Sequence, residues 1–535
     1  MAEELLHDDD LRRIGDRGLA IEDVRRQLAV LRSPPPCTRL LRACTPGDGI
    51  RVLSSSAVEA ALATHVTAAA AGRFLCFVPA SGAATRMFRA LLAVLEGETP
   101  ATRAHLEQRA SAGDKDAREV LEFADGLPRF AFTPALRDVM RQRRADLDGC
   151  ARAGEIASIL AALLDREGLD YAALPKGLLA FHRYADGART AFEEHLVDAA
   201  HYARDGARHV RLHLTVSEQH LAGFAGLLST VRASLEARLD ARFEVGFSHQ
   251  APSTDTVAVD LAGAPFRDGD GHLLFRPGGH GALLDNLAGS GADLAYVKNI
   301  DNVVPDHLKG PVVHWKKVLG GLLVDLQDRV FAALRRLEED ASAAAVDAAL
   351  ELLELELDTP TPAGIRAAAP AERLAHARAK LVRPLRVCGM VRCEGDPGGG
   401  PFWVQGATGD ASPQIVETAQ IDPDDAGQAA LLGSSTRFNP VDLVCGLRDH
   451  RGQPIDLARH VDRDAVFISE KSSGGRKLRA LERPGLWNGS MADWSTVFVE
   501  VPTATFNPVK TVNDLLAPQH QPPVEGEVTA RGVPG

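Results

Sequence analysis

Short apolar runs that alternate with amphipathic stretches dominate the chain. The runs typical of buried strands lie at residues 74–78, 209–217, 243–248, 294–299, 385–392, 414–417, 465–469 and 496–501. Many stretches between them repeat apolar residues every three or four positions, which is the period of a helix with one buried face. Strands that alternate with helices predict a parallel sheet with helices packed on it. We therefore expect an α/β fold with a mostly parallel sheet.

Helical stretches and two polar ends divide this core into parts. The apolar period of residues 312–357 predicts one long helix or a helix pair. The last residues are rich in Pro, Gln and Gly and have little to bury. The expected order is a helical N-terminal cap at 1–68, a first half of the core at 69–311 with a helical insertion at about 97–170, a helical connector at 312–380, a second half at 381–516 and a mobile tail at 517–535.

The charge balance restricts the partners rather than the fold. The 535 residues include 60 Lys and Arg against 72 Asp and Glu, a formal net charge of −12. This surface does not favour coating of nucleic acid, so any anionic ligand needs a local basic pocket. No apolar stretch is long enough to predict a membrane span, and residues 1–24 lack the apolar segment of a secretion signal. Together with seven scattered cysteines, this predicts a cytoplasmic protein without nucleic-acid or membrane partners.

The turn after the first apolar run is the most informative local sequence. Residues 81–86 (SGAATR) follow the strand expected at 74–78 and precede a helical pattern. Small residues let backbone N–H groups approach a phosphate, and the start of the next helix adds partial positive charge. The guanidinium of Arg86 can bind phosphate oxygens in pairs. A plain tight strand-to-helix turn explains the same residues equally well.

Three further segments contain candidate ligand groups. Lys176 lies between a proline and a glycine, which would hold a cation rigidly, although a lone surface lysine is the simpler interpretation. A glycine-rich turn at 277–281 (PGGHG) leads into a helical pattern. Asp301 follows the run at 294–299, and the carboxyl ends of parallel strands form the ligand crevice of open α/β sheets. A carboxylate there is a good Mg²⁺ ligand when phosphates complete the coordination.

In this order, these segments resemble the UDP-sugar pyrophosphorylase group of nucleotidyltransferases, whose fold is a mostly parallel, glycosyltransferase-A-like α/β sheet. The family's first loop runs Gly-Gly-x-Gly-Thr-Arg-Leu, and residues 81–87 keep one glycine, the threonine and the arginine. Its Pro-Lys-Gly matches residues 175–177. Its strand that ends in glutamine is similar to residues 247–250 (FSHQ), and its Pro-Pro-Gly-His-Gly or Gly-Asn-Gly base-binding loop to residues 277–281.

The second half continues the resemblance in the same order. Residues 414–417 (QIVE) resemble a Val-Val-Glu segment whose glutamate contacts the sugar, and residues 438–440 (FNP) resemble a Phe-Asn-x-Gly-Asn loop whose first asparagine also faces it. Residues 486–491 (LWNGSM) are similar to a Pro-Asn-Gly stretch. Residues 506–514 (FNPVKTVND) are similar to Phe-Ser-Pro-Leu-Lys-Asn, whose lysine holds phosphate. The match extends over residues 72–516.

The chain also departs from that pattern. Ala84 replaces a glycine of the first loop, and a long segment separates Arg86 from Lys176 where the family has a short spacer. Residues 440–442 (PVD) replace the usual Gly-Asn continuation. Longer sequence motifs of the chain, for example FRPGGHGAL and TFNPVKTVNDLL, also resemble a bacterial family known only as a domain of unknown function. That second resemblance does not settle an activity.

The first resemblance implies a Mg²⁺-dependent enzyme that makes a nucleotide-sugar, UDP-linked in the family, and pyrophosphate from a nucleoside triphosphate and a sugar 1-phosphate or similar acceptor. It assigns the phosphates to Arg86, Lys176 and Lys510 and the metal to Asp301. The residues implied to bind the nucleotide are Ser81, Gly82, Thr85, Gln250, Gly279 and His280, and those implied to bind the sugar are Glu417, Asn439 and Asn488.

Two other functions fit the same residues. A non-catalytic nucleotide-sugar-binding protein is favoured by Ala84, because its methyl group lies where the family brings backbone close to phosphate. A transferase that uses a nucleotide-sugar donor would share the sheet and the metal carboxylate. The presence of both Lys176 and Lys510 favours pyrophosphorylase chemistry, since a triphosphate has more charge to neutralise. The base, the sugar and the oligomeric state are left open by the sequence.

Overall fold

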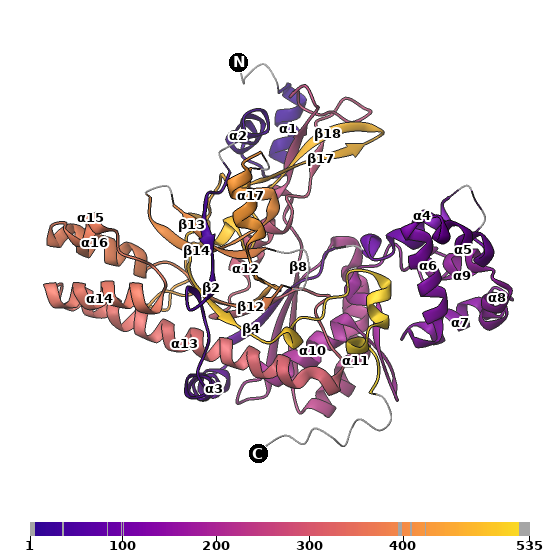
Figure 1. Cartoon of the computed structure of the whole chain (residues 1–535), viewed down its shortest axis with the longest axis horizontal. Coiled ribbons are helices and arrows are strands. Elements are labelled where there is room, and N and C mark those ends of the chain that lie inside the picture. The colour runs from indigo at the N-terminus through magenta and orange to yellow at the C-terminus, as the bar shows by residue number, and fades with distance from the viewer. Residues whose placement is uncertain are drawn as a thin grey trace.

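A sheet of ten strands forms the centre of the molecule (Figure 1). The computed structural model describes residues 6–34, 37–82, 84–97, 99, 101–393, 399–406, 409–422 and 424–523. The strand order is β2-β3-β19-β12-β16-β11-β4-β7-β8, and β15 pairs with one end of β12. In that order, with β15 last, the strands span Thr45–Pro46, Gly49–Arg51, Ser495–Glu500, Leu385–Arg392, Asp442–Gly446, Leu294–Lys298, Phe74–Pro79, His209–Thr215, Arg242–Ser248 and Arg437–Phe438.

Most neighbouring strands of this sheet run parallel. The parallel pairs are β2 with β3, β3 with β19, β19 with β12, β11 with β4, β4 with β7 and β7 with β8. Strand β16 is antiparallel to both of its neighbours, β11 and β12, and β15 is antiparallel to β12. The α/β fold with a mostly parallel sheet, predicted from the sequence, is confirmed.

Helices cover both faces of the sheet. Side chains of β4 alternate between the faces, so that Phe74 belongs to one buried cluster and Phe77 to another. Helices α13 (Lys309–Glu339) and α3 (Ser55–Ala70) pack together on the side of Phe74. Helix α12 (Leu284–Gly289) contributes its leucines to the cluster on the side of Phe77.

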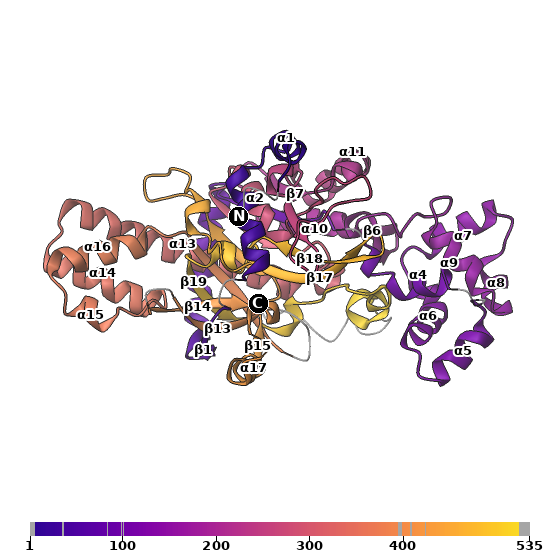
Figure 2. The ribbon, with the colours of Figure 1, turned by 90° about the horizontal axis from the view of Figure 1, so that it is seen from above.

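Two helical lobes lie at opposite ends of the molecule (Figures 1 and 2). One follows the short helix after β4 and comprises α4 to α9, which span Arg89–Leu95, Arg103–Ser111, Lys115–Gly126, Thr133–Gln142, Leu147–Ala153 and Ile156–Leu164. The other extends from the end of α13 and comprises α14 to α16, which span Ala343–Glu356, Ala363–Arg366 and Pro370–Leu381. Residues 312–357, which were predicted to form one long helix or a helix pair, form a pair, α13 and α14.

The N-terminal region is only partly helical. Helices α1 (Asp8–Asp16) and α2 (Ile21–Arg32) pack against a small sheet of order β10-β9-β18-β17. Residues 40–51, which the sequence analysis includes in a helical cap, instead form strands. Of these, β2 and β3 extend the main sheet, because a backbone with free N–H and C=O groups can pair with the edge of β19.

The remaining elements complete the smaller sheets and the surroundings of the core. Helices α10, α11 and α17 span Ala191–Tyr202, Leu221–Leu239 and Ala426–Gly433. Strands β1, β13 and β14 form one small sheet, β5 and β6 another, and the predicted strands at 414–417 and 465–469 belong to small sheets. These strands, with β9, β10, β17 and β18, span Leu40–Ala43, Gly400–Gln405, Ala411–Val416, Ala180–Tyr184, Gly187–Thr190, Thr256–Val259, Phe275–Arg276, Phe467–Ser473 and Arg476–Glu482.

Two expectations concern the surface and the end of the chain. Among the described residues, no helix has both the length and the apolar character that crossing a membrane requires. Residues 518–520 form a short 3₁₀ turn in which His520 is only 1% exposed, so the start of the segment predicted as a mobile tail is packed. Residues 524–535 of that tail lie outside the described residues.

Candidate functional site

The carboxyl ends of β4, β7, β8 and β11 meet at one edge of the main sheet. The N–H of Ala80, after β4, donates to the Thr215 carbonyl at 2.8 Å, and the N–H of Val216, after β7, donates to the Ser248 carbonyl at 2.9 Å. Since all four strands are parallel, the loops that follow them emerge side by side. This edge is where ligands bind in open α/β sheets.

Lys176 joins two of the predicted segments directly. Its Nζ donates to Asp301 Oδ2 at 2.7 Å and to the carbonyl of Val509 at 2.6 Å. The side chains of Lys176 and Asp301 are 15% and 19% exposed, so the pair is largely desolvated yet open on one side. An ion pair in this environment holds its geometry better than a fully exposed pair. Lys176 is therefore not the lone surface lysine of the simpler interpretation, and its contact with phosphate stays a prediction.

The segment that contains Lys510 packs against the carboxyl end of β11. The Val509 N–H donates to the Asp301 carbonyl at 3.1 Å, and the Asn507 N–H donates to Asn302 Oδ1 at 2.9 Å. The Lys510 side chain is half-buried, with its Nζ 5.8 Å from the centre of the Phe506 ring. The residues that immediately precede Lys510 are thus fixed to the same edge as Asp301.

The loop after β4 also reaches this edge. The Ala84 N–H donates to the Leu174 carbonyl at 3.1 Å, two residues before Lys176, and the Met87 carbonyl accepts from the Val512 N–H at 3.1 Å. Ala84 is buried, Ser81 is half-buried, and Gly82, Thr85 and Arg86 are exposed. The structure therefore brings together the segments of Arg86, Lys176, Asp301 and Lys510.

A buried set of charges supports the segment that contains Asp301. Lys309 Nζ contacts Glu194 Oε2 at 2.8 Å and Asp198 Oδ1 at 2.6 Å, while Lys298, the last residue of β11, contacts Asp198 at 3.0 Å. All four side chains are less than 5% exposed. Burial alone would raise the pKa of Glu194, but Lys309 and a histidine lower it to about 2. The two lysines bracket residues 299–308 and fix them to α10.

This set was missed by sequence reasoning. Glu194 and Asp198 lie four residues apart on α10, so they face the same side of the helix. Every residue of α10 except His201 is buried, acids included. The sequence did contain one signal for a buried charge set, a pair of acids four residues apart within a helix that also has Ala, Leu and Val. The same pair equally fits the solvated start of a helix.

A histidine pair links the C-terminal segment to the same charges. His182 Nδ1 lies 3.0 Å from Glu194 Oε1, and His182 Nε2 lies 3.0 Å from His520 Nδ1. The two rings stack with centres 5.3 Å apart. Burial, together with the neighbouring His182, lowers the pKa of His520 to about 3, so His520 is neutral at pH 7. The chain beyond Lys510 is therefore tied to α10.

The glycine-rich turn forms a second group with the segment at 482–488. Gly279 has φ of +76°, and a Cβ built there would lie 2.8 Å from Glu482 Oε2, so both backbone and space require glycine. His280 Nδ1 accepts a hydrogen bond from the Leu486 N–H at 3.0 Å, and its ring stacks on Trp487 with centres 4.1 Å apart. Burial lowers the pKa of His280 to about 4, so the ring is neutral at pH 7.

Glu417 and Asn488 belong to this second group. Burial raises the pKa of Glu417, although hydrogen bonds with Trp487 and Asn488 oppose the shift. Asn488 is 2% exposed, and its Nδ2 donates to the Ile415 carbonyl at 3.1 Å. Its Oδ1 is buried without a hydrogen-bond partner among the described residues. An unpartnered buried acceptor is costly, so this oxygen needs a partner such as an ordered water or a bound ligand.

Two other predicted residues, Asn439 and Gln250, lie outside these two groups of contacts. Asn439 is 4% exposed; its Nδ2 donates to the Gly389 carbonyl at 3.2 Å and its Oδ1 accepts from the Val441 N–H at 2.9 Å. Both polar ends of this side chain are therefore occupied inside the protein. Gln250 follows β8 and is half-buried at the edge described above. A sugar contact by Asn439 and a nucleotide contact by Gln250 stay predictions.

These features define a mixed α/β protein with a polar site built from loops at the carboxyl edge of its sheet. The chain belongs to the family described as "Domain of unknown function (DUF4301)", whose model matches residues 7–521. The resemblance to a family known only as a domain of unknown function is thereby confirmed. No curated protein matches the chain.

Some solved structures are similar to the chain. One is a UDP-glucose pyrophosphorylase from Leishmania major, with 14% identity over 95% of this chain and 77% of that chain and a TM-score of 0.42. Another is the uridine diphosphate N-acetylglucosamine pyrophosphorylase from Trypanosoma brucei, with 13% identity over 91% of this chain and 71% of that chain and a TM-score of 0.45.

Proposed function

We propose that the chain is a nucleotidyltransferase of the pyrophosphorylase type, which joins a nucleoside triphosphate to a sugar 1-phosphate or a similar phosphorylated acceptor. One observation supports this more than any other. Lys176 Nζ connects Asp301 and the carbonyl of Val509, so three motifs that are far apart in the sequence share one desolvated contact. Each motif matches the residue types with which pyrophosphorylases bind phosphates, and their convergence is what that chemistry requires.

The reaction needs positioning and charge neutralisation rather than a side-chain nucleophile. An acceptor phosphate oxygen attacks the α-phosphorus, the bond from that phosphorus to the bridging oxygen breaks, and pyrophosphate leaves with the electron pair. Lys176, Lys510 and Arg86 would hold the phosphate oxygens in line and offset the charge that develops on them. Arg86 is exposed at the opening of the loop, where it can close onto a bound triphosphate.

The residues fit a magnesium ion that shares its coordination with substrate. Asp301 Oδ2 accepts from Lys176, while its other oxygen has no hydrogen-bond partner among the described residues. Mg²⁺ is usually bound by one or two carboxylates, with phosphates and waters as the other ligands. Asp301 would hold the ion, which when bound would neutralise charge on the phosphates. The group of Glu417, His280 and Asn488 would then contact the base and the sugar.

A second function is favoured by a specific contact. The Ala84 N–H, which a phosphate-binding loop would offer to its ligand, donates instead to the Leu174 carbonyl. This arrangement suits a non-catalytic nucleotide-sugar-binding protein. A transferase with a nucleotide-sugar donor is not supported by any contact beyond those given above.

Ligand-dependent unfolding tests the proposal. The thermal midpoint of the full chain is measured with UTP, ATP, CTP, GTP, dTTP and UDP-sugars, each with and without Mg²⁺. A ligand at a hundredfold its Kd stabilises the folded state by about 2.7 kcal/mol, which shifts the midpoint measurably. We expect one nucleoside triphosphate to give a Mg²⁺-dependent shift that Asp301→Asn abolishes. A shift with UDP-sugars alone would favour the binding protein, and no shift at all would contradict both functions.

A further inference from the structure

A cavity of about 250 Å³ lies at the edge of the main sheet opposite to the candidate site. It is lined by Leu385, the first residue of β12, and by Gly446, the last residue of β16, which pair with each other. Gly446 also pairs with Leu294, the first residue of β11, whose other end leads to Asp301. Among the described residues that line the cavity, none is assigned to the candidate site.

Most of the cavity wall is apolar. Its apolar side chains come from α13, from the end of α16 and from the loop after β16, namely Val330, Phe331, Leu334, Leu381 and Ile455. A cavity of roughly 150 Å³ with such a lining holds benzene, so this one has room for a molecule of two fused rings. Ligand cavities typically combine apolar walls of this kind with a few placed polar groups.

Two histidines that line the cavity supply such polar groups. His450 Nε2 lies 2.9 Å from Glu338 Oε1, while its Nδ1 is buried without a hydrogen-bond partner in the described part of the chain. The His450 side chain is only 9% exposed. His460 Nδ1 lies 3.0 Å from Asp493 Oδ2, and its Nε2 makes no hydrogen bond to any described residue. Because an ionised carboxylate only accepts, the hydrogen of each neutral ring lies on the nitrogen beside the carboxylate, and the other nitrogen is left as an acceptor.

The amide of Gln327 adds an unpartnered donor. Gln327 is 3% exposed, and its Oε1 accepts from Arg73 Nη2 at 2.6 Å, which fixes the orientation of the amide. Its Nε2 has no hydrogen-bond partner among the residues that the structure describes. A Cβ built at Gly446 would lie 2.7 Å from this Nε2, so the nitrogen lies against the cavity wall. Buried donors and acceptors are costly to leave unpaired, and one ligand that pairs with all three nitrogens removes that penalty.

The charged side chains of the wall are matched within the protein. Arg383 contacts Asp493 at 2.6 Å, and Arg459 contacts Asp456 at 3.0 Å. Residues 448–449 are an arginine and an aspartate that both make hydrogen bonds to nearby backbone groups. Positive and negative charges are thus equal in number around the cavity. They favour an uncharged ligand, since a buried charge without a partner is costly.

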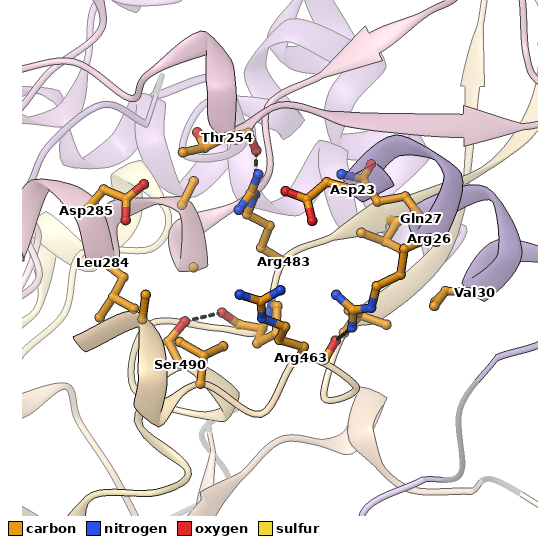
Figure 3. A pocket seen from close by; sticks show the side chains of 17 residues that line it. Asp23, Arg26, Gln27, Val30, Thr254, Leu284, Asp285, Arg463, Arg483 and Ser490 are labelled. Atoms are coloured by element: carbon orange, nitrogen blue, oxygen red, sulfur yellow. Dashed lines mark hydrogen bonds between the residues drawn. The ribbon is translucent and has the colours of Figure 1, made fainter. Parts of the chain in front are cut away.

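The cavity behind the glycine-rich turn differs in this respect (Figure 3). There, Arg483 donates to the carbonyls of Thr254 and Ser253 at 2.8 and 3.0 Å. Arg26 contacts Asp464 at 3.2 Å. Both guanidinium groups are therefore partnered by the protein itself, whereas the three unpartnered nitrogens lie in the cavity between α13 and the loop after β16.

We propose that the cavity between α13 and the loop after β16 binds a small uncharged nitrogen heterocycle that has both N–H groups and a carbonyl. The N–H groups donate to the free nitrogens of His450 and His460, and the carbonyl accepts from Gln327. The ring system packs against Phe331 and the leucines of the wall. A metal ion is not the occupant, because the only His, Cys, Asp or Glu side chains of the described chain that gather closely enough in a group of three to bind one lie elsewhere, at residues 268–272.

A molecule in this cavity is remote from the groups assigned to the proposed reaction. It contacts the later part of α13, whereas Lys309, the first residue of that helix, contacts Glu194 and Asp198 and thereby fixes the segment of Asp301. Helix α13 thus connects the cavity to that segment. The inference does not depend on the proposed reaction.

Calorimetric titration of the full chain at pH 8.0 tests the proposal. The probe is benzimidazol-2-one, a two-ring heterocycle with two N–H groups and one carbonyl, and its 1,3-dimethyl derivative is the matched compound without N–H groups. His450→Phe keeps a ring but removes both nitrogens, and His314→Phe, on the exposed start of α13, is its control. Val382→Trp places a bulky ring at the mouth of the cavity, where Val382 is 48% exposed. Val66→Trp, at a position that is 65% exposed on α3, is its control.

We expect benzimidazol-2-one to bind the unaltered chain and both controls. The dimethyl derivative and the His450→Phe variant should each show weaker binding, since loss of one uncharged hydrogen bond weakens binding roughly two- to tenfold. Val382→Trp should show a larger loss, and His280→Gln, in the second group of the candidate site, should bind the probe normally.

Four results would overturn the proposal: no binding of the probe, equal binding of the dimethyl derivative, binding that both His450→Phe and Val382→Trp leave unchanged, or binding that only His280→Gln removes. The last would place the probe in the candidate site. The nucleotide assays of the proposed function can fail without changing any of these results.

Discussion

Lys176 joins distant segments of the chain through one ammonium group, and under the proposed function it would also bind phosphate. Its ammonium compensates the Asp301 carboxylate at the edge of the sheet and also holds the carbonyl of Val509. A carboxylate alone at this position would repel phosphates, whereas the pair leaves the edge close to neutral. Under the proposed function, Lys510 and Arg86 would add the positive charge that a triphosphate needs in an otherwise acidic chain.

The first prediction concerns the charged groups of this edge. Under the proposed function, Lys510→Ala and Asp301→Ala each remove one preorganised contact with the reacting phosphates, and such losses lower turnover by roughly 10²- to 10³-fold. Steady-state assays of pyrophosphate release measure the effect, with circular dichroism to check the fold. Lys477→Ala, on the exposed part of the β17–β18 hairpin, is the matched control and should leave turnover unchanged. Near-normal turnover in both edge variants would contradict the assignment of Lys510 and Asp301 to the reacting phosphates.

The second prediction concerns the glycine after Lys176. A Cβ at Gly177 would lie 2.7 Å from the Phe224 ring, with Ile300 close by, so Gly177→Ala forces the buried ring to move. We expect it to destabilise the fold by about 1–3 kcal/mol. Gly226→Ala, in the open on α11, should instead be neutral or stabilising by up to about 1 kcal/mol. Urea unfolding of the two variants compares them, and equal stability would contradict the packing.

Sequence reasoning found the site residues that lie in loops with unusual composition. The Pro-Lys-Gly and glycine-rich segments were visible because few structures other than tight turns need them. Glu194, Asp198, Lys298 and Lys309 were not found, because an ion pair between distant segments leaves no local pattern. The motif around Asn439 was visible in the sequence, but the hydrogen bonds that its amide makes inside the protein were not.

At the scale of elements, the C-terminal segment is held from two sides. Asn513 Nδ2 donates to the Glu119 carbonyl at 2.8 Å and contacts Glu122 Oε2 at 3.0 Å, both on α6 of the insertion. On the other side, His520 contacts His182, which lies next to α10. In both views this segment lies between the sheet and the insertion lobe (Figures 1 and 2). The insertion therefore serves to position the segment that contains Lys510.

The third prediction tests that role of the insertion. Asn513→Ala removes both contacts with α6 and should increase the hydrogen exchange of residues 509–517, measured by mass spectrometry, while the main sheet stays protected. Asn507→Ala is the control, since among the described residues its side chain donates only to the nearby Ala504 carbonyl. Unchanged exchange in Asn513→Ala would show that the insertion does not hold the segment.

The fourth prediction concerns pH. The pKa of His520 is about 3 in the folded chain, whereas the ordinary value is 6.5. Below pH 6.5, His520 therefore binds a proton in the unfolded chain but stays neutral in the folded chain. Stability is therefore lost as pH falls from about 6.5, by about 2 kcal/mol at pH 5 for this one group. His520→Gln should lose correspondingly less stability between pH 7 and pH 5 in urea unfolding. An identical pH dependence of the two proteins would contradict the buried histidine pair.

Most strands and helices could be predicted from the apolar pattern. Strand β16, the short strands β2 and β3, and the packing of His520 could not. Strand β16 has a buried aspartate, Asp442, that pairs with Lys316 of α13, so its sequence does not look like a central strand. Strands β2 and β3 are too short to show a period. The packing of His520 depends on a partner more than three hundred residues away. Each depends on contacts that only the folded chain reveals.

At the scale of the whole molecule, the parts are arranged around one edge of the sheet. The insertion lobe borders the side of Lys510 through the C-terminal segment, and the N-terminal helices with the β17–β18 hairpin border the side of His280 and Glu417. The lobe of α14 to α16 extends away from both. Each of the two groups of candidate residues is thus bordered by a separate helical unit.

The most direct measurement is pyrophosphate release by the full chain with Mg²⁺, a nucleoside triphosphate and a panel of sugar 1-phosphates. We expect release that requires both substrates, with formation of the matching nucleotide-sugar in equal amount, and its loss in Lys176→Met. Nucleotide binding without release for any sugar phosphate would contradict catalysis and leave a nucleotide-sugar-binding protein. Release without dependence on Lys176, Asp301 or Lys510 would show that the reacting phosphates bind elsewhere.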